Sequence, residues 1–209
     1  MYHVLNRAAG RRRIFETEQD YAAFQKVMEE SRHRTPMRVL CYCLMPNHWH
    51  LVLWPAEDGQ LSEYMQWLTM THTQRWNAFH EAVGTGPLYQ GRFKSFPIAG
   101  DEHFFSVCRY VERNALRANL VSRAERWKWS SLWQRANDSY DVTLNAWPIA
   151  PGEGWMEYVN GVETEAELAA IRNSVKRGAP YGGREWQRET ATRLGLERTL
   201  NPRGRPRKG

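Results

Sequence analysis

Residues 37–54 read MRVLCYCLMPNHWHLVLW, and this stretch decides the fold class. Met37 to Leu44 is rich in residues that favour β-strands, and so is the run from His48 to Trp54. Between them, Asn47 after Pro46 is typical of a tight turn. The stretch therefore predicts a β-hairpin, in which successive side chains of each strand point to opposite faces of a sheet.

The sequence around this hairpin predicts the rest of an α+β domain. Tyr2 to Asn6 fits a short strand, and Thr17 is a suitable cap for a helix whose apolar residues follow a helical period. A long helix is expected from Leu61 to Phe79, then a strand from Arg92 to Ile98 and a helix capped by Asp101. The order βαββαβ plus a helix fits a ferredoxin-like antiparallel sheet with helices packed on one face, which leaves the other face for a ligand.

Composition limits the class of protein. The 209 residues are 42% hydrophobic and 25% charged, which is typical of one folded domain with an extension and excludes a disordered chain. Without a long apolar run or a signal-like start, a cytoplasmic protein that does not enter the membrane is expected. Cys41, Cys43 and Cys108 are too few for a disulfide framework and are expected to be buried thiols.

Charge divides the chain into three parts. Residues 1–137 have a small excess of Lys and Arg, residues 138–171 contain seven acidic residues and no Lys or Arg, and residues 172–209 contain eleven basic and three acidic residues. We expect a compact domain over 1–137, an acidic linker segment over 138–171 and a basic C-terminal tail over 172–209. The acidic segment is expected to cover a basic surface as a phosphate mimic or to neutralise the tail, with a solvated linker as the alternative.

His48 and His50 are the first candidates for chemistry. Two histidines at i and i+2 of a strand share one face, so their imidazoles can converge on one metal ion. Two ligands do not make a metal site, and ordinary hydrogen bonding would equally explain the pair. Tyr110 and Asn114 are spaced to share one face of the predicted helix that could meet the histidines, although Tyr110 alone would also suit a core position.

Taken together, these residues resemble a known family. The run from Met45 to Val52 is similar to the metal-binding strand of the single-tyrosine HUH transposases, in particular the REP-associated tyrosine transposases of bacteria. Ala115 departs from the resemblance, because the family usually has Pro there, and Trp49 replaces an aliphatic residue that faces away from the metal. Four further segments agree in order: Tyr2-His3-Val4 with Asn6-Arg7 and Ile14-Phe15, Gln90 to Ser95, Tyr110 to Asn114 with Arg117-Ala118, and Trp127 to Ser131.

The resemblance implies a strand transferase that acts on DNA. Tyr110 would be the nucleophile that attacks a phosphodiester in single-stranded DNA and forms a 5′-phosphotyrosine, and His48, His50 and Asn114 would hold a divalent metal. Imidazole, amide oxygen and water suit Mg²⁺ or Mn²⁺, with Mn²⁺ favoured in vitro. Zinc remains open, because Cys41 and Cys43 occupy the neighbouring predicted strand.

The resemblance also implies the partner, which is single-stranded DNA in which palindromic repeats fold as hairpins, bound by a monomer or a homodimer. Arg203-Gly204-Arg205-Pro206 is similar to an AT-hook core, and an unspecific basic tail would explain these residues equally well. The candidate DNA-binding residues are Arg7, Arg11, Arg12, Arg13, Arg92, Lys94, Arg113, Arg117, Arg203 and Arg205.

Two other classes of function compete with this prediction. A binding protein of the same fold that has lost catalysis would recognise repeat DNA without cleaving it, but Tyr110, both histidines and Asn114 are all present. An RNA-binding ferredoxin-like protein would need exposed aromatic residues in a central strand, and this pattern is missing.

Overall fold

The computed structural model describes residues 1–100 and 102–201, and its elements follow the predicted order up to the helix that carries Tyr110. The sheet and its connections are formed by β1 (Tyr2–Arg7), η1 (Ala9–Arg11), α1 (Glu18–Arg34), β2 (Arg38–Met45), β3 (His48–Trp54), α2 (Gln60–Phe79) and β4 (Lys94–Pro97). The rest of the described chain forms α3 (Glu102–Glu112), α4 (Asn114–Arg117), η2 (Ala124–Arg126), α5 (Ser131–Ala136), α6 (Trp155–Asn160), α7 (Glu165–Arg177), α8 (Arg184–Leu194) and α9 (Glu197–Leu200).

The sheet confirms the predicted ferredoxin-like topology. Its strand order is β2-β3-β1-β4, and each pair of neighbours is antiparallel. In the pairing of β1 with β3, Leu5 lies opposite His50 and Arg7 lies opposite His48. This register places the end of the first strand beside the predicted histidine pair.

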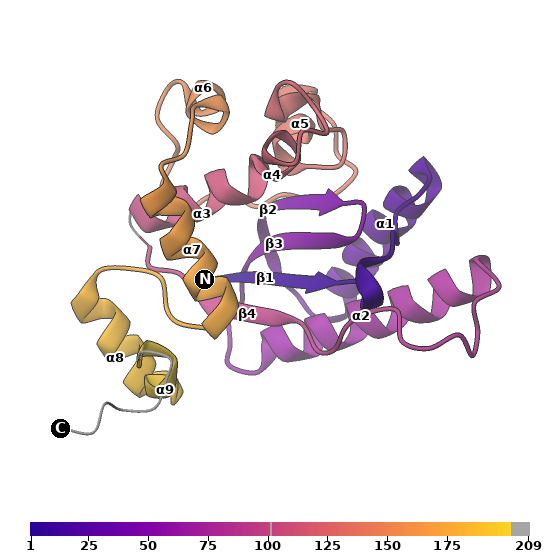
Figure 1. The fold of residues 1–209 in the computed structure, drawn as a ribbon, viewed down its shortest axis with the longest axis horizontal. Helices are drawn as coiled ribbons and strands as arrows, with labels where there is room; N and C mark the ends of the chain where they lie inside the picture. The colour runs from indigo at the N-terminus through magenta and orange to yellow at the C-terminus, as the bar shows by residue number, and fades with distance from the viewer. Residues whose placement is uncertain (101, 202–209) are drawn as a thin grey trace.

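Each face of the sheet has its own hydrophobic core. Helices α1 and α2 cover one face, where Phe24, Trp49 and Tyr64 are fully buried. On the other face, Val52 packs with Phe104 of α3, and α7 also contacts this core. Figure 1 shows the sheet at the centre of the molecule, with α3 and α7 on the opposite side from α1 and α2. The expectation that this face is left for a ligand is therefore wrong over most of its area, because apolar residues of β2 and β3 need a cover there.

Local sequence signals explain where most elements begin and end. Thr17 caps α1 through a reciprocal pair of hydrogen bonds with Asp20, as its position predicts. The last strand is shorter than predicted, since β4 begins at Lys94. Before it, the Asn6 side-chain amide donates to the carbonyl of Gly91 at 3.1 Å, a bond that takes the place of regular strand pairing. Asp101, the predicted cap of the next helix, lies outside the described residues.

The predicted tyrosine helix is broken in two. α3 ends at Glu112, and α4 begins at Asn114 after Arg113, which keeps helical backbone angles (φ −79°, ψ −3°). Tyr110 and Asn114 therefore do not share one continuous helix, which corrects the sequence-based expectation. Ala115 has an N–H that a proline would lack, so the break arises without the residue that usually produces it.

The acidic segment contains helical structure and packs on the tyrosine helix. Trp147 and Trp155 lie against the core beside α3, where the Trp155 indole donates to the buried Glu112 carboxylate at 2.9 Å. α7 crosses the expected boundary between residues 171 and 172. The three cysteines are free and buried, as predicted. Within the described ranges, no helix is long and apolar enough to cross a membrane.

Candidate active site

Side chains from β3 and α3 meet on the face of the sheet that α3 covers. His48 and His50 alternate with Trp49, whose ring is buried in the core under α1 and α2. The ring centroids of His48 and His50 are 5.1 Å apart, and that of Tyr110 is 5.8 Å from that of His50. The predicted histidine pair and the predicted tyrosine therefore share one site.

His3 is a member of this site that sequence reasoning missed. It lies on β1 opposite Val52, on the same face as His50, and its Nε2 is 2.8 Å from Nδ1 of His50. Its ring centroid is also 6.2 Å from that of Tyr110. The alternation of side chains along β1 could have pointed to His3, but only if the register between β1 and β3 were known.

Hydrogen bonds orient both predicted metal-binding histidines. Nδ1 of His48 is 2.6 Å from Oδ1 of Asn47, and Nδ1 of His50 contacts His3. In the described structure neither Nε2 atom has a hydrogen-bond partner. Burial lowers the pKa of His48 to about 4 and the pKa of His50 well below its usual value, so both rings are neutral at pH 7. A neutral imidazole whose Nδ1 is occupied presents Nε2 as a metal ligand.

Asn114 supplies the remaining polar group of the predicted ligand set. It is buried, and its Nδ2 has no hydrogen-bond partner although it is shielded from solvent. The unpaired atom is the donor nitrogen, which needs an acceptor such as water or a phosphate oxygen, and a cation would bind the amide oxygen Oδ1 instead. Among the described residues, no group of three His, Cys, Asp or Glu side chains could hold a metal. A metal here would therefore depend on two imidazoles, the Asn114 amide and water, a donor set that suits Mn²⁺ or Mg²⁺ better than structural zinc.

Tyr110 is held in place by an arginine. The guanidinium carbon of Arg117 lies 4.2 Å from the centre of the phenol ring, and Arg117 also donates to the backbone carbonyl of Tyr110 at 3.0 Å. Tyr110 is 8% exposed, so most of the residue is packed. Two other tyrosines, Tyr64 and Tyr89, are buried in the core under α1 and α2, on the other face of the sheet.

A cavity of about 390 Å³ brings together three of the predicted DNA-binding residues. Arg7, Arg92 and Lys94 line it together with Gln90 and main-chain groups of the adjoining loop. Arg7 lies opposite His48 in the sheet, and its Nε is buried without a hydrogen-bond partner. The cavity is therefore a cationic hollow beside the histidine pair.

The other predicted DNA-binding residues have different surroundings. Arg11 and Arg13 are exposed, and Arg12 lies over the Trp76 ring at 5.2 Å. Arg113 and Arg117 are paired with Glu163 of the acidic segment, at 3.3 and 2.7 Å, so they are not free in this conformation. Arg203 and Arg205 lie outside the described residues.

Comparisons with known proteins show which family the chain resembles. Residues 1–114 match the family model described as IS200-like transposase. A solved REP-associated tyrosine transposase bound to a REP hairpin is 16% identical, over 73% of this chain and 89% of that chain, with a TM-score of 0.49. A candidate transposase from Deinococcus radiodurans R1 is 12% identical, over 53% of this chain and 87% of that chain, with a TM-score of 0.42. No curated protein matches the sequence.

The family match covers more than half of the chain and includes every described residue of the histidine and tyrosine site. The class of protein is thus a DNA transposase. The chain belongs to the IS200-like transposase family. Members of such a family cleave and join DNA strands and are generally metal-dependent.

Proposed function

We propose that the protein cleaves and rejoins single-stranded DNA at hairpins formed by palindromic repeats, with Tyr110 as the nucleophile. The observation that carries this proposal is the contact of Tyr110 with His50, and of His50 with His48, on one face of the sheet. The substrate class comes from the sequence resemblance described above, and the cationic hollow at Arg7 supports it through its position beside the histidines.

In the proposed reaction, the phenolic oxygen of Tyr110 attacks the phosphorus of a phosphodiester. An O–P bond forms to the tyrosine while the bond from phosphorus to the 3′ oxygen breaks, the phenol proton passes to solvent and the 3′ oxygen takes up a proton from water. The energy of the ester is retained in the 5′-phosphotyrosine, so another 3′-hydroxyl can reverse the reaction and join two strands.

His48, His50 and Asn114 would hold a divalent cation, Mn²⁺ or Mg²⁺. The cation supplies charge stabilisation at the phosphate, which a phenol with a pKa near 10 needs at neutral pH. The protein's own contribution is positioning: Arg117 holds the Tyr110 ring from one side, and β3 fixes both histidines on one face.

The test uses a pool of single-stranded hairpin oligonucleotides with randomised flanks, labelled at either end and incubated with Mn²⁺. The 3′-labelled DNA should migrate with the protein on a denaturing gel, and the 5′-labelled product should carry a free 3′-hydroxyl. Tyr110→Phe should abolish the adduct, whereas Tyr140→Phe, at a position that is 87% exposed, should not. Adduct formation by the Tyr110→Phe variant would refute the assignment, and hairpin binding without any adduct would favour a repeat-binding protein that has lost catalysis.

A further inference from the structure

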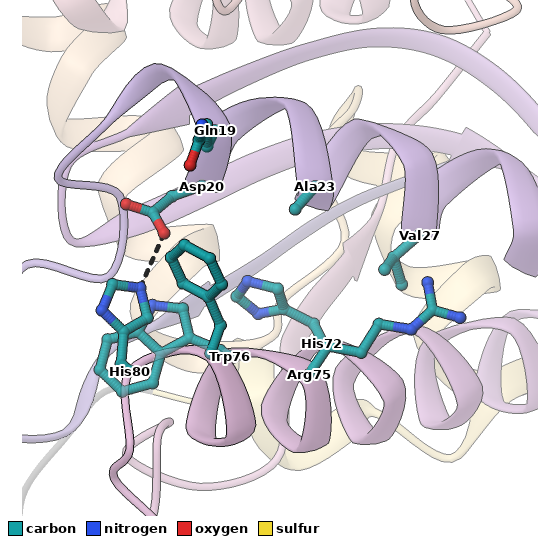
Figure 2. A pocket seen from close by; sticks show the side chains of 9 residues that line it. Gln19, Asp20, Ala23, Val27, His72, Arg75, Trp76 and His80 are labelled. Carbon is teal, nitrogen blue, oxygen red and sulfur yellow. Dashed lines mark hydrogen bonds and ion pairs between the residues drawn. The ribbon is translucent and has the colours of Figure 1, made fainter.

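A second cavity lies far from the tyrosine in sequence, between the two helices of the opposite face. It has a volume of about 310 Å³ and is lined from α1 by Asp20, Ala23 and Val27, among others. Side chains of the last turns of α2 complete it: His72, Arg75, Trp76 and Phe79, followed by His80. Figure 2 shows His72 and Trp76 extending from α2 into the space that faces α1, with His80 hydrogen-bonded to Asp20. None of these residues takes part in the proposed cleavage reaction.

His72 offers a hydrogen-bond donor at the floor of this cavity. The Trp49 indole donates to the Tyr89 hydroxyl at 3.0 Å, and that hydroxyl is 2.7 Å from Nδ1 of His72. Tyr89 is buried, so its own proton is satisfied only if it is donated to Nδ1 of His72, and the ring proton of the neutral imidazole then resides on Nε2. Burial lowers the pKa of His72 to about 3, which keeps the ring neutral.

The Nε2–H group of His72 has no partner within the described residues, although the side chain is only 3% exposed. The ring cannot turn away, because it packs between Phe24 and Phe15, with ring centroids 4.8 and 5.7 Å away. A fixed donor that lines a cavity favours a ligand with an acceptor atom.

The walls of the cavity favour a flat ring. Phe79 is 65% exposed, and its ring contacts His80 only edge-on, at 80°, so its faces are free within the described part of the chain. The Asp20 carboxylate accepts hydrogen bonds from His80 and from the backbone N–H of Thr17, so its oxygens already have partners. The side chain opposite, Ala23, is small and leaves the mouth open.

Positive charge near the cavity favours a ligand that is part of a polyanion. Arg12 lies over Trp76, whose indole donates to the carbonyl of Ile14 at 2.8 Å, so the basic loop of Arg11 to Arg13 borders the cavity. We propose that the cavity receives one unpaired nucleobase of a DNA strand, whose ring stacks on Phe79 and whose edge accepts a hydrogen bond from Nε2 of His72. That the base comes from DNA rests on the proposed function. That the cavity binds a base does not depend on it.

The test uses 2′-deoxyadenosine 5′-monophosphate as the probe and NMR signals of the Ala23 methyl group and the His72 imidazole as readouts. The nucleotide should shift both signals, and 2-deoxyribose 5-phosphate, which lacks the base, should not. Ala23→Leu fills the mouth of the cavity and should abolish the shift at His72. Ala22→Leu is the matched control, because Ala22 is exposed on the same helix and does not line the cavity.

The same variants extend the test to DNA. Ala23→Leu should weaken binding of a single-stranded oligodeoxyadenylate by about tenfold relative to Ala22→Leu, the loss expected for one stacked base. Should Ala23→Leu misfold, Phe79→Ala takes its place, since that ring is exposed. Equal responses of the Ala23→Leu and Ala22→Leu proteins, or a response to the sugar phosphate alone, would overturn the proposal. The titration requires no cleavage, so its failure is distinguishable from failure of the Tyr110 adduct assay.

Discussion

Glu163→Gln tests whether the acidic segment holds back DNA binding at the tyrosine site. Glu163 comes from residues 138–171, and its carboxylate lies 2.7 Å from Nη1 of Arg117 and 3.3 Å from Nε of Arg113. Arg117 also contacts the Tyr110 ring. The carboxylate lies between two arginines that we expect to bind a DNA phosphate.

The structure sets the size of the expected effects. The Glu163 side chain is 5% exposed and the two arginine side chains are 14% and 18% exposed, so these are largely buried, charge-assisted contacts. Replacing the carboxylate by an amide of equal volume should cost about 2–4 kcal/mol of folding free energy. Two released arginines should steepen the dependence of log Kd on log salt for single-stranded DNA by up to about 1.4, at ~0.7 for each phosphate contact.

The assay is fluorescence anisotropy with a labelled hairpin oligonucleotide across a salt series, combined with urea unfolding. Glu165→Gln removes the same charge from the same segment at an exposed position and is the matched control. Only Glu163→Gln should steepen the salt dependence. If both variants give the wild-type slope, Glu163 does not compete with DNA, and the contact serves the fold alone.

Three other outcomes are expected. His48→Ala should abolish Mn²⁺-dependent adduct formation, and Asn114→Ala should reduce it less, because water replaces a neutral amide ligand more readily than an imidazole. Full activity of the intact protein in EDTA would contradict the metal assignment. His3→Ala should weaken Mn²⁺ binding, measured by electron paramagnetic resonance, by about 10–100-fold, and His3→Gln should restore part of it through its carbonyl oxygen. Burial raises the pKa of Asp20, but hydrogen bonds from Thr17, Glu16 and His80 outweigh this effect and lower that pKa. Asp20→Asn should therefore reduce the free energy of unfolding by about 1 kcal/mol at pH 7, measured by urea unfolding. The difference from wild type should disappear as the pH falls below about 4, where the Asp20 carboxylate becomes protonated.

The sequence predicted the order and type of the elements up to the tyrosine helix, because the apolar residues there repeat with the periods of strands and helices. The helices from Ser131 onward were not predicted. Strand residues around Asn47 alternate between two buried faces, and the helix after Thr17 has a cap and an apolar stripe. The sequence could not predict which side chains bind the loops next to the sheet. The Asn6 side chain binds the carbonyl of Gly91 in the loop before β4, and this strand starts two residues later than its composition suggests.

Site residues were predictable from the sequence where they lie on the same face of one strand. They were not predictable where their position depends on how two elements pair. His48 and His50 share a face because a strand alternates, and Tyr110 meets them as the resemblance implies. His3 joins them only through the β1–β3 register, which its sequence position does not reveal. The separation of acidic and basic blocks was visible in the sequence, but the contact of Glu163 with Arg117 depends on how the acidic segment folds back.

Strand β3 contributes residues to both the proposed metal site and the hydrogen-bond chain of the proposed base cavity. His48 and His50 point to the tyrosine face, and Trp49 between them points to the other face, where its indole begins the hydrogen-bond chain through Tyr89 to His72. A base bound at His72 would strengthen that chain, since a hydrogen bond at Nε2 polarises the imidazole and its neighbours. Because Trp49 is fully buried and paired on both sides in the sheet, its position constrains the histidines that flank it. The same alternation of side chains that forms the two cores therefore links the proposed metal ligands to the proposed base cavity through the hydrogen-bond chain that starts at Trp49.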